Sequence, residues 1–351
     1  MNDQDDLGGG TPGGQEHEQE TAGWKDIVRK YQRSSAWLGA CQILDTVGPY
    51  ALLWVLMYFA AGVSYWLVVP LAVLAGAFLV RIFIIFHDCT HGSFFKSGRA
   101  NDILGFLAGV LVFTPYHHWR WEHTVHHSIA GDLDRRGMGD IWTLTVQEYL
   151  DASPWKRFSY RLARNPFVLF ALAPLFLFVV LHRIPSRDAK ARERRWVYVT
   201  NLAIAAMAGG LAWIFGLKAY LVIQSVTLLV ASTAGVWLFY VQHQFEGVCW
   251  ERKDDWDFAR AALEGSSFYK LPGILQWFTG SIGFHHIHHL SPRIPNYRLK
   301  RAQNAEPLFQ QVKPLTLRAS LKSFTFRLWD EGQRKLVGFK ALRAVRPKAG
   351  K

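Results

Sequence analysis

Residues 65–91 read YWLVVPLAVLAGAFLVRIFIIFHDCTH, and this stretch decides the fold. Its larger part, Tyr65–Phe86, is an apolar run interrupted by a single charge, Arg81. A bilayer core of about 30 Å needs roughly 20 apolar helical residues to cross it, so the run predicts a membrane-spanning helix. His87 and His91 follow directly, and a spacing of four places both on one helical face. The stretch therefore predicts a span that delivers two imidazoles to one membrane surface.

Three more apolar runs are long enough to cross a bilayer. Thr46–Ser64 comes just before the first run and is joined to it by a tight turn at 62–64. Val197–Leu217 and Ala219–Val241 are separated essentially by Lys218. Lys and Arg gather at every other junction, which the positive-inside rule places in the cytoplasm. We therefore predict an all-α integral membrane protein with four transmembrane helices in two hairpins, interfacial helices and a cytoplasmic helical cap.

A fifth apolar run, Pro166–His182, has basic clusters at both ends, before it at 156–164 and after it at 183–195. Such flanks argue against a crossing, so we expect this run to lie in the cytoplasmic interface or to re-enter the membrane from that side. If it crossed instead, five spans would put the C-terminal third on the opposite side. Ile103–Thr114 is too short to cross and suits a buried or interfacial helix.

The composition agrees with a membrane protein that has strongly charged parts outside the bilayer. Half of the 351 residues are hydrophobic and 19% are charged, which excludes a disordered or coiled-coil chain. Residues 1–24 carry six acids and no Lys or Arg, so we expect a disordered acidic tail there, followed by an amphipathic lead-in at 25–45. The main domain is expected at 46–310 and a basic cytoplasmic segment at 311–351. The net charge of +13 indicates membrane orientation rather than nucleic-acid binding, and three cysteines fit a reducing compartment.

Nine histidines have the spacing of metal ligands. His87 and His91 form the first box, two H-x-x-H-H patterns form the second and third boxes, and one more histidine follows the last span. A lone histidine is more often a surface or packed core residue, which is our interpretation of His17, His117, His118, His182 and His286. The candidate ligands are His87, His91, His123, His126, His127, His243, His285, His288 and His289.

Topology tests this interpretation independently. The second and third boxes can share a site only if an even number of spans separates them, and the four-span arrangement puts two spans there. Nine imidazoles exceed the roughly six ligands that a first-row metal accepts, so we expect two metal ions. Imidazole suits Zn, Cu, Fe and Ni alike, so ligand type does not select the metal. Ligating histidines usually donate their second N–H to a carboxylate or carbonyl, and the nearby acids are Asp88, Glu122, Asp132, Asp134 and Glu246.

The boxes resemble those of the membrane fatty acid desaturase family. The resemblance rests on HDCTHGSFF at 87–95, WEHTVHH at 121–127 and GFHHIHHLSPRIPNYRL at 283–299. The last motif is most similar to bacterial and plastid acyl-lipid desaturases of the omega-6, delta-12-like type, and VQHQFE at 241–246 resembles the same subgroup. The match covers roughly residues 45–310 in order, spacing and hydropathy.

This resemblance implies an O2-dependent oxidoreductase that introduces a double bond into an acyl chain of a membrane lipid. The nine histidines would hold a diiron centre, with no catalytic side chain beyond it. The sequence contains no haem, flavin or iron–sulfur motif, so an external donor, a ferredoxin or a cytochrome b5-like protein, would supply electrons. The resemblance also implies the bacterial cytoplasmic membrane, with both termini and the metal centre on the cytoplasmic side. It implies no nucleic-acid partner and leaves the oligomeric state open.

Two alternatives remain open. Other membrane diiron oxygenases, such as alkane hydroxylases and carotenoid hydroxylases or ketolases, use similar boxes, although the ending HHLSPRIPNY at 288–297 favours the desaturase. A metal transporter would place its ligands near the bilayer midplane, whereas these histidines lie outside the apolar runs. Aromatic residues near the boxes suit interfacial anchoring or a tunnel lining: Trp119, Trp121, Trp277 and Phe278.

Overall fold

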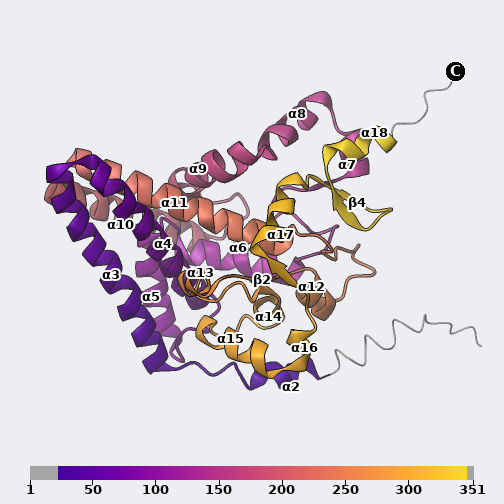
Figure 1. Ribbon diagram of the computed structural model, residues 1–351, viewed down its shortest axis with the longest axis horizontal. Coiled ribbons are helices and arrows are strands. Elements are labelled where there is room, and N and C mark those ends of the chain that lie inside the picture. Colours follow the sequence, from indigo (N-terminus) through magenta and orange to yellow (C-terminus); the bar gives the residue numbers. More distant parts are fainter. Residues whose placement is uncertain (1–22, 346–351) are drawn as a thin grey trace, which may run out of the picture.

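The computed structural model describes residues 23–345, and these form a mostly helical molecule (Figure 1). Four helices are long and apolar enough to span a membrane: α3 (Ala36–Val63), α4 (Tyr65–Thr90), α10 (Ala191–Phe215) and α11 (Leu217–His243). They gather at one end of the molecule, and the short helices and strands of the C-terminal third lie at the other (Figure 1). The predicted helical fold with four long apolar helices is thus confirmed, and the bent pair at 154–183 is a fifth candidate span if it crosses as one unit. Residues 1–22, which make up nearly all of the predicted acidic tail, lie outside the described residues.

Single residues separate the helices of each hairpin. Between α3 and α4, the extended Ser64 accepts a hydrogen bond from the backbone N–H of Trp66. Between α10 and α11, Gly216 has a φ of 82°, which glycine adopts without strain. The first span, α3, begins well before Thr46, where the sequence predicted its start. The Ser35 hydroxyl caps this helix by accepting a hydrogen bond from the N–H of Leu38.

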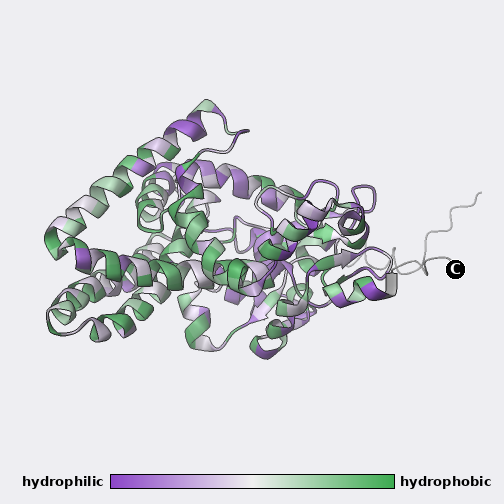
Figure 2. Cartoon of the chain, turned by 90° about the horizontal axis from the view of Figure 1, so that it is seen from above, coloured by the Kyte–Doolittle hydropathy of each residue, from purple (hydrophilic) through white to green (hydrophobic). Residues whose placement is uncertain are grey.

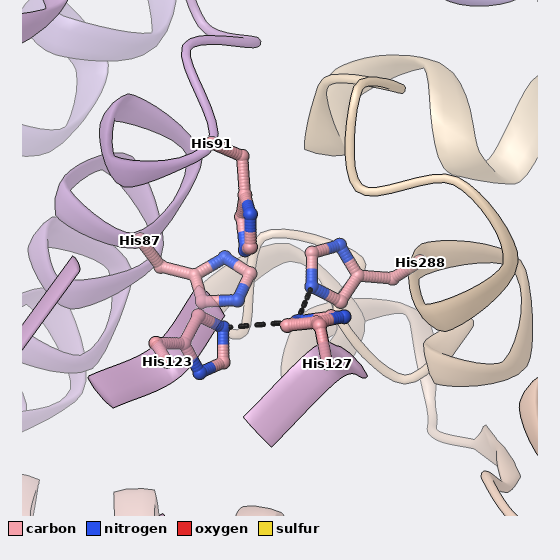
Figure 3. A group of neighbouring side chains, drawn as sticks. All are labelled: His87, His91, His123, His127 and His288. Carbon is pink, nitrogen blue, oxygen red and sulfur yellow. Dashed lines mark hydrogen bonds between the residues drawn. The ribbon is translucent and has the colours of Figure 1, made fainter. Parts of the chain in front are cut away.

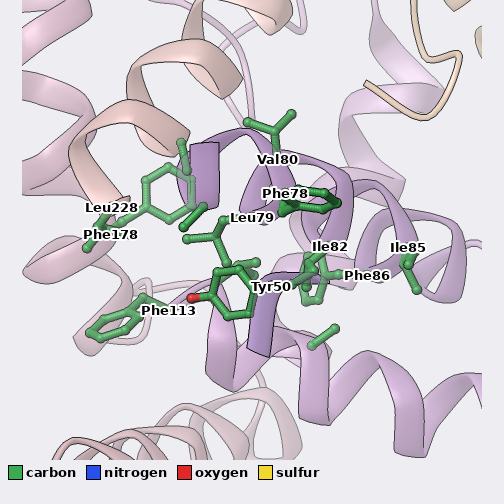
Figure 4. Packing of buried hydrophobic residues seen from close by; sticks show 14 of the residues in the cluster. Tyr50, Phe78, Leu79, Val80, Ile82, Ile85, Phe86, Phe113, Phe178 and Leu228 are labelled. Carbon is green, nitrogen blue, oxygen red and sulfur yellow. The ribbon is translucent and has the colours of Figure 1, made fainter. Parts of the chain in front are cut away.

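The core of the spanning part surrounds α4, which packs against α3, α11 and the shorter helix α5 (Gly98–Leu111). In its most apolar window 61% of α4 is buried, against 17% for α10, so α4 is central and α10 peripheral. Figure 4 shows side chains of α4 meeting Phe178 and Leu228 from later segments. The spans are largely hydrophobic, as their green colour in Figure 2 shows, and their exposed residues include Trp66 and Trp213, which are 85% and 87% exposed. A bilayer would cover this surface.

The fifth apolar run is helical from Val168 to Arg183, and the chain bends sharply where this run meets the preceding helix. It contains a π-helical turn, and it forms with the preceding helix a pair bent by 61°. At its start Arg164 donates to the side chains of Tyr240 and Gln244, and beyond its end Ser186 donates its backbone N–H to His118. Both flanks therefore contact segments that carry clustered histidines, His243 in one case and the second box in the other. The elements are α8 (Pro154–Ala163), η1 (Val168–Leu172), α9 (Ala173–Val179) and η2 (Leu181–Arg183).

Five short strands, which the sequence did not predict, hold the remaining part together. The first sheet has the order β1-β4-β5, with β1 (Leu144–Thr145) parallel to β4 (Leu328–Asp330) and β5 (Lys335–Val337) antiparallel to it. In the second sheet β2 (Phe268–Lys270) pairs in parallel with β3 (Pro314–Thr316). The first sheet attaches the C-terminal segment to the chain that follows the second box, and the second sheet attaches β3 to the strand that precedes the third box.

The other helices complete this part and the N-terminal lead-in. Val28 and Tyr31 of the lead-in are buried against the segment after the third box, so residues 24–35 form a strap across it. The helices are α2 (Trp24–Arg29), α6 (Tyr116–Ile129), α7 (Val146–Asp151), α12 (Phe258–Glu264), α13 (Gly273–Phe278), α14 (His285–Leu290), α15 (Asn296–Ala305), α16 (Pro307–Gln310), α17 (Leu317–Ser320), η3 (Leu321–Thr325), η4 (Phe339–Ala341) and α18 (Leu342–Val345).

Candidate metal centre

All three boxes lie on helices, at ends that point to one place. His87 lies in the last turn of α4, and His91 is its C-terminal cap residue. The second box occupies the last turns of α6, the third box forms α14, and His243 is the last residue of α11. Helices distant in sequence thus bring all nine predicted histidines together.

Five of these histidines form one cluster (Figure 3). One ring nitrogen from each lies within 4.8 Å of the others, and the residues are His87, His91, His123, His127 and His288. Within this five-histidine cluster, Nε2 of His127 lies 3.1 Å from Nε2 of His123 and 3.1 Å from Nε2 of His288. Ring nitrogens from three separate boxes therefore converge.

The other four histidines lie beside this cluster. His126, His243 and His289 offer nitrogens within 4.8 Å of one another. Nε2 of His285 lies 3.0 Å from Nε2 of His243, which makes it the fourth member. The rings of His127 and His289 stack with centroids 4.1 Å apart, so the four-histidine cluster directly adjoins the five-histidine cluster.

Helical geometry explains how one box serves two clusters. Successive helical residues are about 100° apart, so adjacent histidines point in different directions, whereas residues four apart share a face. In the second box, His123 and His127 enter the five-histidine cluster and His126 enters the other. In the third box the numbers are reversed: only His288 enters the five-histidine cluster, whereas His285 and His289 belong to the four-histidine cluster. The H-x-x-H-H pattern is therefore suited to two neighbouring sites.

Burial favours the neutral, metal-binding form of several clustered imidazoles. Eight of the nine histidines are buried, and His91 is half-buried. Burial, reinforced by the neighbouring imidazoles, holds the pKa well below the usual histidine value for His123, His127, His285, His288 and His289. Neutral imidazole is the form that coordinates metal.

Unpaired ring nitrogens show that these clusters fit metal ions. Buried polar atoms are rarely left without a partner. Here Nε2 of His91 and of His289 are buried without one. Neither cluster contains a carboxylate or thiolate, and an all-imidazole set suits first-row transition metals rather than Ca²⁺ or Mg²⁺.

One acidic residue contacts each cluster. Oδ1 of Asp88 lies 3.3 Å from Nδ1 of His87, and Oδ1 of Asp140 lies 2.7 Å from Nδ1 of His126. Such contacts fix ring orientation and tautomer. Asp140 was not predicted, since it lies in a loop beyond the second box. Gly139 there has a φ of 74°, and a Cβ on it would lie 3.0 Å from Cβ of His126.

Of the five acids proposed from sequence, Asp88 contacts a clustered histidine and the other four were wrong. Their carboxylates pair elsewhere because nearer partners are present. The pairs are Glu122 with His118, Asp132 with Arg135, Asp134 with Arg252, and Glu246 with Lys322.

The histidines set aside from sequence lie outside both clusters within the described residues. His117 packs against the ring of Trp196, and His182 lies 3.4 Å from the Thr114 hydroxyl. Nε2 of His286 faces Oε1 of Gln303 at 3.0 Å, and burial lowers the pKa of His286 to about 3. His17 lies outside the described residues.

Aromatic side chains and one small cavity border the centre, and a larger groove lies elsewhere, along the N-terminal half of α11. The Trp119 ring stacks on His123 at 4.2 Å, while Trp121 lies against His118. Trp277 and Phe278 pack on Phe78 of α4. A cavity of about 30 Å³, enough for a water molecule, touches His243 and Asp140. An apolar groove of about 500 Å³ lies between α9 and α11 and is lined by Phe113, Leu172, Leu175, Phe176, Val179, Val180, Tyr220, Leu221, Gln224, Ser225 and Leu228.

Comparisons with known proteins agree with this geometry. The family model described as "Fatty acid desaturase" matches residues 64–316. A fatty acid desaturase of Bacillus subtilis is 49% identical over 304 residues, covering 87% of this chain and 86% of its own. In Synechocystis, a ferredoxin-type sn-1 acyl-lipid omega-3 desaturase is 29% identical over 73% of this chain and 70% of its own. An sn-1 oleoyl-lipid 12-desaturase of the same organism is 28% identical over 78% and 76%.

The matched region includes all three boxes and His243, and thus every member of both clusters. Its four candidate spans make the chain an integral membrane protein. The chain belongs to the fatty acid desaturase family and is an oxidoreductase.

Proposed function

We propose that this protein is an O2-dependent acyl-lipid desaturase with a histidine-ligated diiron centre. One observation carries the proposal: nine imidazoles, from helices far apart in sequence, form two adjoining clusters at one end of the candidate spans. The five-histidine cluster would hold one iron and the four-histidine cluster the other. Bound there, two iron ions would supply the strong oxidant that removal of hydrogen from an unactivated alkyl chain requires.

The protein contributes position and exclusion of water. Asp88 and Asp140 orient the rings of His87 and His126, and Trp119 covers the face of His123. The overall reaction removes two hydrogens from neighbouring carbons of the chain and forms the double bond. O2 takes up these hydrogens with two electrons and two protons and leaves as two water molecules. No side chain of the site is required to act as nucleophile, acid or base.

A membrane lipid is the proposed substrate. The relatives named as acyl-lipid desaturases support it. Those relatives include both an omega-3 and a 12-desaturase, so the omega-6, delta-12-like position remains our prediction from the third box. The electron donor is proposed to be a ferredoxin or a cytochrome b5-like protein, and a relative named for ferredoxin supports the first.

We further propose that the clusters and both termini face the cytoplasm. The charge distribution of the sequence supports this orientation. The bent segment 154–183 supports re-entry from that side, because Arg164 within it contacts the segment next to His243 and Ser186 beyond its end contacts the helix of the second box. Four spans then bring every box to the same membrane surface.

Fatty acid profiling tests the function directly. The chain would be expressed in a host without polyunsaturated lipids, together with the variants His126→Ala and His286→Ala. His126 belongs to a cluster, whereas His286 in the third box belongs to neither. We expect new double bonds with the unmodified chain and His286→Ala, and none with His126→Ala. New hydroxyl or keto groups would support the alternative oxygenases, and an unchanged lipid profile would count against the proposal.

A further inference from the structure

A buried chain of polar side chains connects the first span to the five-histidine cluster. It runs from Gln42 on α3, through Asn296 at the start of α15, to Asp88 and His87 on α4. The exposed fractions are 4%, 2%, 1% and 4%, so solvent reaches none of them. These residues come from the first span, the first box and the segment after the third box.

The donors and acceptors in this chain are aligned in one direction. Nε2 of Gln42 donates to Oδ1 of Asn296 at 3.0 Å. Asn296 in turn donates twice to Oδ2 of Asp88, from its backbone nitrogen at 2.6 Å and from Nδ2 at 2.9 Å. The other oxygen of Asp88 faces Nδ1 of His87 at 3.3 Å. Gln42 thus fixes which end of the Asn296 amide faces the carboxylate.

The charge of Asp88 makes these donors necessary. A buried carboxylate is costly unless hydrogen bonds or a cation compensate it. Among the described residues Asp88 forms no ion pair with Lys or Arg, and its compensating donors are Asn296 and His87. Any loss of donation from Asn296 therefore changes the position and the hydrogen bonding of the carboxylate that His87 faces.

We propose that Asn296, held in place by Gln42, is a positioning residue for the metal bound by the five-histidine cluster. It fixes Asp88, which accepts the Nδ1–H of His87 and leaves Nε2 of that ring for the metal. The assignment rests on the proposed function, because it requires His87 to be a ligand. It makes full assembly of this site dependent on docking of α15 against the first span. Neither residue is one of the box histidines, although Asn296 lies in the longer motif at 283–299.

The same helix supplies a matched control. Gln303 also lies on α15 and is also buried, at 6% exposure. Its Oε1 faces Nε2 of His286 at 3.0 Å, and its Nε2 donates to the carbonyl oxygen of Phe309. Since His286 belongs to neither cluster, removing the Gln303 amide deletes a comparable buried contact to the third box without reaching a ligand.

Iron binding by the full-length protein tests the proposal. Asn296→Leu and Gln303→Met keep the length of the side chain and remove its amide. Each purified protein would be titrated anaerobically with Fe(II) against a competing chelator, giving the number of irons per chain and the affinity of each site. We expect two irons for the unmodified chain and for Gln303→Met. Asn296→Leu should keep one site unchanged and bind the second iron about 10- to 100-fold more weakly, the usual effect of losing such a support.

The outcomes separate this inference from the function on which it rests. Two irons bound by Asn296→Leu as tightly as by Gln303→Met would overturn the positioning role and leave the diiron proposal intact. An unmodified chain that binds no iron would overturn both. If Asn296→Leu does not elute as a folded protein, Gln42→Met decides, because Gln42 contacts the carboxylate only through Asn296. A severalfold loss of affinity at one site supports the role, and unchanged affinity at both sites overturns it.

Discussion

We expect close packing between α4 and α11 to contribute to the stability of the protein. These two spans also carry His87 and His243 at their ends. Gly76 of α4 lies where they cross. A Cβ added there would lie 2.7 Å from Cβ and Cγ1 of Val230 and 3.1 Å from the carbonyl oxygen of Thr227. Ordinary contacts begin at 3.4 Å, so Gly76→Ala requires a retreat of 3.4 − 2.7 = 0.7 Å. Small residues allow such close approach of helices in membranes.

The size of the effect follows from comparison with Gly235→Ala. Gly235 lies on α11, and a Cβ added there meets nothing within 4 Å. Both substitutions gain the same helix propensity, roughly 1 kcal/mol, so this gain cancels between them. The difference leaves the cost of overpacking, about 1–3 kcal/mol. We therefore expect Gly76→Ala to unfold more readily than Gly235→Ala by about this amount.

Thermal unfolding in detergent, followed by size-exclusion chromatography, measures the difference. Gly76→Ala should have the lower midpoint, and its iron content after heating should fall earlier. Equal midpoints for the two alanine variants would refute the close approach of α4 and α11 as a source of stability.

Three further predictions concern a buried arginine, pH and salt. The Arg81 guanidinium lies 3.9 Å from the centre of the Trp277 ring and donates a hydrogen bond to Thr46. A lysine cannot stack on the ring in this way, so Arg81→Lys should lose about 1.5–3 kcal/mol of stability, nearly as much as Arg81→Met. An unfolding midpoint of Arg81→Lys equal to that of the unmodified chain would contradict this prediction. Burial lowers the pKa of the third-box imidazoles, so below about pH 6.5 the unfolded chain binds protons that the folded chain does not. The metal-free protein should therefore lose stability from pH 7 to pH 5. A melting temperature that stays constant or rises as the pH falls over this range would count against the prediction. If an acidic electron-donor protein binds the basic surface, the KM for this donor should rise steeply with salt concentration. A KM that does not change with salt would instead argue for apolar docking of the donor.

Much of the architecture could be predicted because it depends on local periodicity. Apolar runs of spanning length gave α4, α10 and α11, and the spacing within each box placed its histidines on helices. The separation of the second and third boxes by two spans correctly placed them together. The start of α3 at Ala36 was missed, because the capping hydroxyl of Ser35 lies outside the apolar run.

The contacts that orient the histidines could not be predicted, because they depend on tertiary folding. Asp140 reaches His126 through a loop, and Asn296 reaches Asp88 across 208 positions of sequence. Nearness in sequence instead favoured acids such as Asp134 and Glu246, which pair with basic side chains. The short strands were missed because a strand of two or three residues is too short to show an alternation of apolar and polar residues.

The central claim is that the two clusters are separate iron sites of one centre. Iron per chain should be measured for the unmodified protein and for His126→Ala, His127→Ala and His286→Ala after identical purification. We predict two irons for the unmodified chain and for His286→Ala. Each of the other variants should retain about one, because His126 and His127 belong to different clusters. A single zinc in the unmodified chain, or two irons retained by His126→Ala, would contradict the claim.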